Sequence, residues 1–162
     1  MLTIPKIVTR GAKRYLAIRQ SVSIPFGKAI DKVMPKVGRW FEQQGIETGP
    51  AIFKYNRIDM PSLDMEFGFL TAKSLTPDGE IEAGVLPAGR YVTPTHFGHY
   101  RHLRDATAVL LGWAKISGLE LDMRKTKKGE LFASRFELYP NGPMDEPDSD
   151  KWETQLFMKL KE

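Results

Sequence analysis

The feature that most constrains the fold of this chain is an internal repetition of short motifs. Ala12-Lys13-Arg14-Tyr15 recurs 76 positions later as Ala88-Gly89-Arg90-Tyr91. A tryptophan followed five residues later by a Gly-aliphatic-Glu triplet also recurs, at Trp40 and, 73 positions on, at Trp113. Two matches in the same order and at nearly the same offset indicate that the chain contains two copies of one structural unit.

Hydrophobic periodicity predicts the elements of this unit. Residues 7–21 alternate like a strand, and apolar residues over 26–41 recur at the spacing of a helix face. Pro35 falls inside that helix and is expected to kink or restart it. Two strands are expected next, at 51–59 and 63–70. The same order returns in the second half, as an extended segment, a helix and two strands, over 82–96, 100–117, 131–139 and 152–160.

The expected fold class is therefore α+β, with duplicated βαββ halves. We expect one domain over 1–162, with a first repeat at about 6–71, a linker at about 72–81 and a second repeat at about 82–162. Each half is expected to form an antiparallel sheet with one main helix on a face. Two sheets related by a pseudo-twofold axis would leave a central ligand groove between them.

Composition excludes several kinds of site. The 162 residues include no cysteine, which excludes disulfides, thiolate metal sites and cysteine nucleophiles. Phosphate-loop and common hydrolase signatures are missing. His96, His99 and His102 lack a carboxylate motif to complete a metal site, so neither a metal nor a cofactor is expected. No apolar run approaches the roughly 20 residues of a membrane span, and no signal peptide is recognisable, so the expected location is the cytoplasm.

Basic residues are concentrated at the start of the chain. The net charge is +4, and residues 1–60 hold 11 basic and 4 acidic residues. Such a surface can face nucleic acid or an acidic protein, or simply water. No recognition helix or aromatic-interleaved basic stripe accompanies the charge, so a solvated surface is the expected reading.

A carboxylate inside an apolar strand is the strongest local indication of function. Glu137 lies between Phe136 and Leu138 and shares a strand face with Tyr139 and Arg135. Because burying a carboxylate without a partner costs free energy, we expect that Glu137 faces solvent, is neutralised by Arg135, or has a functional role. In an aromatic pocket its pKa would rise by desolvation and fall when a cation bound. Such a group suits a countercharge for a lipophilic cation, or a general acid or base for attack by water.

Aromatic side chains are the natural walls of such a pocket. Four of them accompany the glutamate as candidate ligand-binding residues, although each also fits a plain hydrophobic core; the set is Glu137, Tyr139, Phe53, Tyr55 and Tyr91. In an enzyme, Glu137 and Tyr139 would be the catalytic candidates. Glu66 is a second, weaker carboxylate candidate, because it alternates away from its apolar neighbours and is expected to be solvated.

Four short motifs follow one another in the second half of the chain: Pro87-Ala88-Gly89-Arg90-Tyr91, His96-Phe97-Gly98-His99-Tyr100, Phe136-Glu137-Leu138-Tyr139 and Asp150-Lys151-Trp152-Glu153-Thr154. Their order and spacing resemble those of the GyrI-like small-molecule-binding domain, also called the AraC-type effector-binding domain. The resemblance covers nearly the whole chain. Each motif is weak alone, but together they are fairly specific.

The resemblance implies two βαββ repeats around a groove that binds hydrophobic, often cationic, aromatic compounds, with Glu137 as the central glutamate. Family members joined to a helix-turn-helix domain are drug-sensing transcription regulators. The repeats account for all 162 residues here, so direct DNA binding is not expected. Stand-alone members are proposed to sequester toxins, to inhibit DNA gyrase, or to hydrolyse strained cyclopropane-bearing DNA alkylators.

Three functions therefore remain open. The preferred one is binding of hydrophobic, cationic or aromatic small molecules for sensing or sequestration. The second is hydrolysis of cyclopropane-type alkylators, in which Glu137 activates water or protonates the leaving group while Tyr139 or Tyr55 donates a hydrogen bond to developing negative charge. The third is inhibition through a protein partner, such as gyrase or a regulator. The first two use the same carboxylate, so the residues alone do not separate them.

Overall fold

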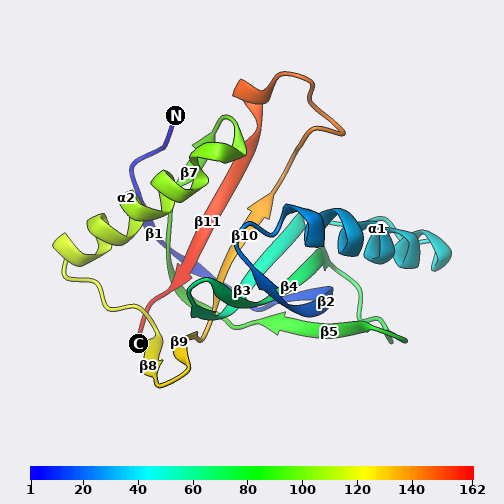
Figure 1. Cartoon of the computed structure of the whole chain (residues 1–162), viewed down its shortest axis with the longest axis horizontal. Helices are drawn as coiled ribbons and strands as arrows, with labels where there is room; N and C mark the ends of the chain where they lie inside the picture. The colour runs from blue at the N-terminus through cyan, green and yellow to red at the C-terminus, as the bar shows by residue number, and fades with distance from the viewer.

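The computed structural model describes residues 1–162, which form two α-helices and eleven β-strands (Figure 1). The helices are α1 (Gly27–Gln43) and α2 (Leu103–Ile116), the second preceded by a 3-10 turn at Tyr100–His102. The strands are β1 (Lys6–Arg10), β2 (Lys13–Ser23), β3 (Ala51–Asp59), β4 (Ser62–Thr71), β5 (Ile81–Leu86), β6 (Gly89–Thr93), β7 (Thr95–Phe97), β8 (Met123–Thr126), β9 (Gly129–Phe132), β10 (Arg135–Tyr139) and β11 (Glu153–Lys159).

All strands belong to one curled antiparallel sheet, in the order β1-β6-β11-β10-β3-β4-β2-β5, with β7 on β11 and the β8–β9 hairpin on β3. The expected α+β class is confirmed. The expectation of two separate sheets is wrong, because β3 and β10, one from each expected half, are hydrogen-bonded neighbours. Their pairing satisfies backbone groups that two separate sheets would leave open at their edges.

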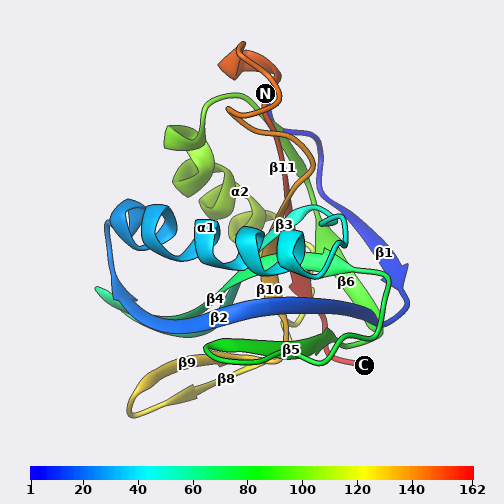
Figure 2. The same ribbon diagram turned by 90° about the vertical axis from the view of Figure 1, so that its right-hand side faces the viewer.

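Both helices lie on the same face of this sheet (Figure 2). Helix α1 packs on β2 and β4 through a cluster that includes Val33, Val37, Phe41, Leu16, Met65 and Phe67. Helix α2 packs on β6 and β11 through a second cluster, which includes Leu110, Val92, Leu156 and Met158. The helices thus cover the two flanks of the sheet, and its centre, at β3 and β10, lies between them.

On its other face the sheet curls around a third cluster. Tyr15 of β2 and Tyr91 of β6 both belong to it, although four strands lie between β2 and β6. Phe136 and Leu138 of β10 and Ile52 of β3 also point into this cluster. Alternation along β10 therefore sends Glu137 to the helix side, since successive side chains leave a strand on opposite faces.

Two local expectations are corrected by the structure. The single strand expected over 7–21 is two strands, because β1 pairs with β6 while β2 pairs with β4 and β5 near the other end of the sheet. Pro35 does not interrupt α1, which is one continuous helix. Val33 and Val37 are buried on either side of it, and this packing offsets the backbone hydrogen bond that the proline removes.

The segment 72–80, between β4 and β5, contains no helix or strand. It is nevertheless attached to the first half, because the Trp40 indole donates a hydrogen bond to Asp78 over 2.6 Å. No helix in the chain combines the length and the hydropathy that a membrane crossing requires.

Candidate functional site

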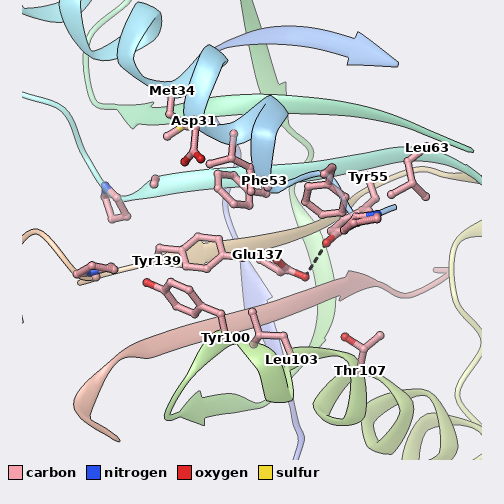
Figure 3. Close-up of a pocket in the computed structure, with 18 of the residues that line it drawn as sticks. Asp31, Met34, Phe53, Tyr55, Leu63, Tyr100, Leu103, Thr107, Glu137 and Tyr139 are labelled. Atoms are coloured by element: carbon pink, nitrogen blue, oxygen red, sulfur yellow. Dashed lines mark hydrogen bonds between the residues drawn. The ribbon is translucent and has the colours of Figure 1, made fainter. Parts of the chain in front are cut away.

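A cavity of about 1570 Å³ lies between the two helices, over the centre of the sheet (Figure 3). Strands β3 and β10 form its floor, and the loop at 140–145 closes one end. Helix α1 contributes Ile30, Asp31 and Met34, and α2 with its preceding turn contributes Tyr100, Leu103, Arg104 and Thr107. The cavity exists because neither helix covers the two central strands.

Glu137 lies on the floor of this cavity. It is 8% exposed and stands in register with Phe53 of β3 and Leu156 of β11. Two phenol hydroxyls donate to its carboxylate, one to each oxygen. The Tyr55 hydroxyl reaches Oε1 over 2.9 Å, and the Tyr139 hydroxyl bonds Oε2. The carboxylate is therefore held at both oxygens by neutral donors.

The electrostatics of this group follow from its burial. Desolvation raises the pKa of Glu137 above its ordinary value, against the opposing effects of the two tyrosine hydrogen bonds and the positive charge of Arg135. The pKa values of Tyr55 and Tyr139 are raised well above normal, first by burial and then by Glu137. Both tyrosines thus stay protonated and remain donors. Glu137 itself is neither solvent-exposed nor joined to Arg135 in an ion pair.

Aromatic rings form a continuous wall beside the carboxylate. The ring centroids of Phe53 and Tyr139 are 4.7 Å apart, and Tyr100 meets Tyr139 edge-on at 5.5 Å. The Trp152 ring packs against Tyr100, with the ring centroids 4.7 Å apart. A flat ligand resting over Glu137 would therefore meet ring faces and edges along one side.

Four of the five predicted ligand-binding residues come together here: Glu137, Tyr139, Phe53 and Tyr55 all line the cavity. Tyr91 does not, and its assignment to the pocket is wrong. It is 1% exposed on the opposite face of the sheet, where its hydroxyl donates to the Pro87 carbonyl over 2.7 Å and its ring packs against Phe136. The physical reason is strand parity, because Val92, its neighbour, is the residue that faces α2.

The sequence reasoning missed the contribution of α2. Tyr100, Leu103, Arg104 and Thr107 all line the cavity. Their spacing of three and four residues marks one side of a helix, and it is displaced from the core side formed by Ala106, Leu110 and Ala114. This second row of residues, beside the core-facing one, could have identified α2 as a wall of the cavity. Arg135, which the sequence suggests only as a partner for Glu137, also lines the cavity.

Glu66, expected to be solvated, is buried on the opposite face of the sheet, at 9% exposed. It accepts hydrogen bonds from the Tyr15 hydroxyl and from Asn56 Nδ2, each over 2.9 Å, and pairs with Lys54 Nζ at 3.3 Å. Its charge is therefore matched inside the protein. No three His, Cys, Asp or Glu side chains are grouped so that they could hold a metal ion.

The fold defines a class of α+β domains in which two helices cover one face of a curled antiparallel sheet and leave a ligand-sized cavity between them. Within that class, the chain belongs to the GyrI-like family. The model of the GyrI-like small molecule binding domain matches residues 4–161, nearly the whole sequence. No curated protein matches the chain in a sequence comparison.

Solved structures with the same fold include part of a DNA-bound protein and several chains that match over nearly their whole length. The EcmrR C-terminal domain superposes with a TM-score of 0.77 at 21% identity, over 98% of each chain. In the EcmrR–DNA complex the match covers 98% of this chain but only 57% of EcmrR, so this chain spans little more than half the length of EcmrR. SAV2435 bound to tetraphenylphosphonium has a TM-score of 0.59 at 11% identity, over 98% of this chain and 94% of SAV2435.

A hydrolase from Listeria innocua also shares the fold, with a TM-score of 0.63 at 10% identity, over 97% of this chain and 91% of the hydrolase. At such identities these likenesses show a common fold and nothing more. The activities belong to the proteins in which they occur.

Proposed function

We propose that this protein binds hydrophobic, aromatic cations in the cavity between α1 and α2, with Glu137 as the countercharge. The observation that carries the proposal is the state of that carboxylate. It is buried, held by two neutral hydroxyls, and paired with no cation of the protein. A positive ligand would supply the missing charge and reverse the rise in the pKa of Glu137.

The aromatic wall supports the same proposal. A cation over an aromatic face contributes about 0.5–2 kcal/mol, with the larger values at desolvated sites. Phe53, Tyr139 and Tyr100 offer several such faces around one carboxylate. Rings select flat or multi-ring compounds by contact area, so we expect micromolar binding with loose shape selectivity.

The relatives supply a biological setting for this proposal. The lipophilic cation tetraphenylphosphonium is bound in the SAV2435 structure, and the EcmrR domain belongs to a protein that contacts DNA. We extend the first property to this chain as drug or toxin sequestration or sensing. A transcriptional response would in addition need a regulator as protein partner.

A second candidate function is hydrolysis, favoured by the raised pKa of Glu137. As a carboxylic acid it would protonate the carbonyl oxygen of a strained cyclopropane-bearing substrate while water attacks a ring carbon. The carbon–carbon bond of the ring breaks, its electrons move toward that oxygen, and the proton released by water restores the acid. General acid–base help of this kind typically gives a ~10²–10⁴-fold acceleration.

We also propose that the two halves are copies related by a pseudo-twofold axis. The strand order supports this, because β2-β4-β3 on one side of the sheet centre mirrors β6-β11-β10 on the other. The first strands are exchanged in the same symmetric way, since β1 pairs with β6 and β5 pairs with β2.

The test is calorimetric titration with tetraphenylphosphonium and with neutral triphenylphosphine oxide, on the wild type, Glu137→Gln and Glu82→Gln. Glu82 is an exposed residue of β5 outside the cavity and is the matched control. We expect the cation to bind wild type and Glu82→Gln equally, and Glu137→Gln at least about tenfold more weakly. Equal binding by Glu137→Gln would overturn the proposal.

The same proteins, incubated with strained-ring alkylators, separate the two candidate functions by mass spectrometry. A water adduct formed by the wild type and by Glu82→Gln, but not by Glu137→Gln, would establish the hydrolase. Unchanged compound retained by the wild type would favour binding alone.

A further inference from the structure

A second charged group of the cavity floor, Arg135, has no role in the function proposed above. It lies two residues before Glu137 on β10 and lines both the main cavity and a small side pocket next to it. Its guanidinium carbon is 5.3 Å from the ring centre of Tyr55 and 4.9 Å from that of Phe132. Stacking between two rings fixes the position of this cation.

The guanidinium of Arg135 has no polar partner in the protein. Every salt bridge and side-chain hydrogen bond of the cavity floor involves other groups, and neither Glu137 nor Glu130 reaches Arg135 within ion-pair distance. This contrasts with Lys54, on the other face of the sheet, which is paired with Glu66. A planar group with five donors is thus left without an acceptor.

These donors are not sealed inside the protein. Only two polar side-chain atoms are both fully buried and unpartnered, His96 Nδ1 and Thr154 Oγ1, and neither belongs to the site. The unpartnered Arg135 nitrogens therefore retain accessible surface. Thr107 lines the same main cavity and side pocket from α2, and its side chain is half-buried. Figure 3 shows Thr107 on the α2 wall that faces the floor with Glu137.

The other charged groups around the cavity lie at its solvent-exposed rim and form no ion pair with Arg135. Asp31 and Asp145 line the cavity with Arg104, but all three side chains are exposed to solvent. Burial lowers the pKa of Arg135, against the smaller raising effects of Tyr55, Glu137 and Glu130. The floor therefore presents an anion and a cation that attract each other through space but form no ion pair or hydrogen bond with each other.

We propose that Arg135 and Thr107 form a second recognition point, which binds an anionic oxygen group of the ligand. The preferred ligand is then an aromatic zwitterion, with a cationic nitrogen at Glu137 and a carboxylate or phenolate at Arg135. This inference rests on the proposed function, because it assumes that ligands occupy this cavity. A guanidinium binds a carboxylate through two parallel hydrogen bonds, which adds direction to the charge attraction.

Two xanthene dyes that differ by one methyl ester provide the test. Rhodamine 110 carries a free carboxylate beside its cationic ring system, and rhodamine 123 is its methyl ester. We expect the wild type to bind rhodamine 110 about tenfold more tightly than rhodamine 123, measured by fluorescence polarisation. In Arg135→Met the preference should disappear, through weaker binding of rhodamine 110 and unchanged or tighter binding of rhodamine 123.

The affinity ratio of the two dyes is taken within each protein sample, so a partly folded variant does not distort it. Arg135→Lys, which keeps the charge, should preserve a preference for rhodamine 110. Thr107→Val should reduce the preference without abolishing it. If Arg135→Met does not fold, these two variants decide the question.

The outcomes also separate this inference from the proposed function. If rhodamine 123 binds through Glu137 and rhodamine 110 binds no better, or if the ratio ignores Arg135, the second recognition point is overturned and cation binding stands. If neither dye nor tetraphenylphosphonium binds the wild type, both proposals fall.

Discussion

Glu66 and Glu137 are two buried glutamates on nearby strands of one sheet, and their carboxylates have different kinds of partners. Each accepts a hydrogen bond from a tyrosine, Tyr15 for Glu66 and Tyr55 for Glu137. Glu66 is also paired with Lys54, whereas Glu137 has only a second tyrosine. Glu66 forms an ion pair inside the fold, whereas Glu137 is bound only by neutral donors and forms no ion pair.

The difference arises in β3, which serves both faces of the sheet. Lys54 and Asn56 leave it on the side of Glu66, while Phe53 and Tyr55 leave it on the side of Glu137. A buried charge with an internal partner has a structural role, because removing either partner leaves the other charge buried and unpaired. A buried charge with no such partner lowers the stability of the fold and can pair with a ligand of opposite charge. The predictions below test that division.

The largest expected effect is on stability, from Lys54→Met. The variant leaves Glu66 buried without its cation, and we expect a loss of roughly 3–5 kcal/mol in the free energy of unfolding. Urea denaturation measures it. The double variant Lys54→Met/Glu66→Gln should recover much of the loss. A single variant within about 1 kcal/mol of the wild type would contradict an architectural role for the pair.

Tyr15→Phe should have the next largest effect, again on stability alone. It removes a hydrogen bond to a charged acceptor, which contributes about 1.5–3 kcal/mol. The cavity is on the other face, so affinity for tetraphenylphosphonium should equal that of the wild type. A loss of affinity in the folded variant would show that the two faces are coupled.

The pH dependence of binding should reveal the raised pKa of Glu137. Cation binding needs the carboxylate, so affinity should fall about tenfold, or about 1.4 kcal/mol, for each pH unit below that pKa. Tyr139→Phe removes a hydrogen bond that lowers the pKa and should move the transition to higher pH. Dissociation constants measured from pH 4 to pH 8 test both statements, and a flat wild-type profile would refute them.

The smallest expected effect is a gain in stability from Glu137→Gln. A carboxyl group with a raised folded-state pKa stabilises the fold at low pH, and this contribution is lost as the pH rises through that pKa. The amide avoids the loss, so we expect the variant to be about 1 kcal/mol more stable at pH 8, or about 2–4 °C in melting temperature.

At pH 4 the advantage of Glu137→Gln should vanish, because the wild-type carboxyl is then protonated. Thermal unfolding at both pH values gives the comparison. A variant less stable than the wild type at pH 8 would mean that Glu137 belongs with Glu66 among the architectural charges.

The elements of the fold could be predicted from the sequence because their signals are local. The apolar spacing over 26–41 gives α1, and alternation gives β4 and β10. The pairing of β3 with β10 could not be predicted in the same way. It joins residues more than 80 positions apart and depends on which strand edges remain open after each half has folded.

The candidate site could be predicted in part, because one of its residues also gives a local signal in the sequence. An acidic residue between Phe136 and Leu138 breaks the pattern of a buried strand, and this signal identified Glu137. Tyr91 was misplaced because a strand pattern gives which residues share a face, but not which face the helices cover. That choice is made by packing over the whole sheet, and it also decides that Glu66 and Glu137 have different surroundings.

The pairing of β1 with β6 and of β5 with β2 has a consequence for how the chain can be divided. Strand β1 completes the sheet beside β6, and β5 completes it beside β2. The residues before 72 therefore supply one edge strand to the residues after 80, and the reverse also holds. Neither segment forms a complete sheet by itself. We expect a break within 72–80 to leave two fragments that fold only together, because each fragment needs a strand of the other to complete its part of the sheet.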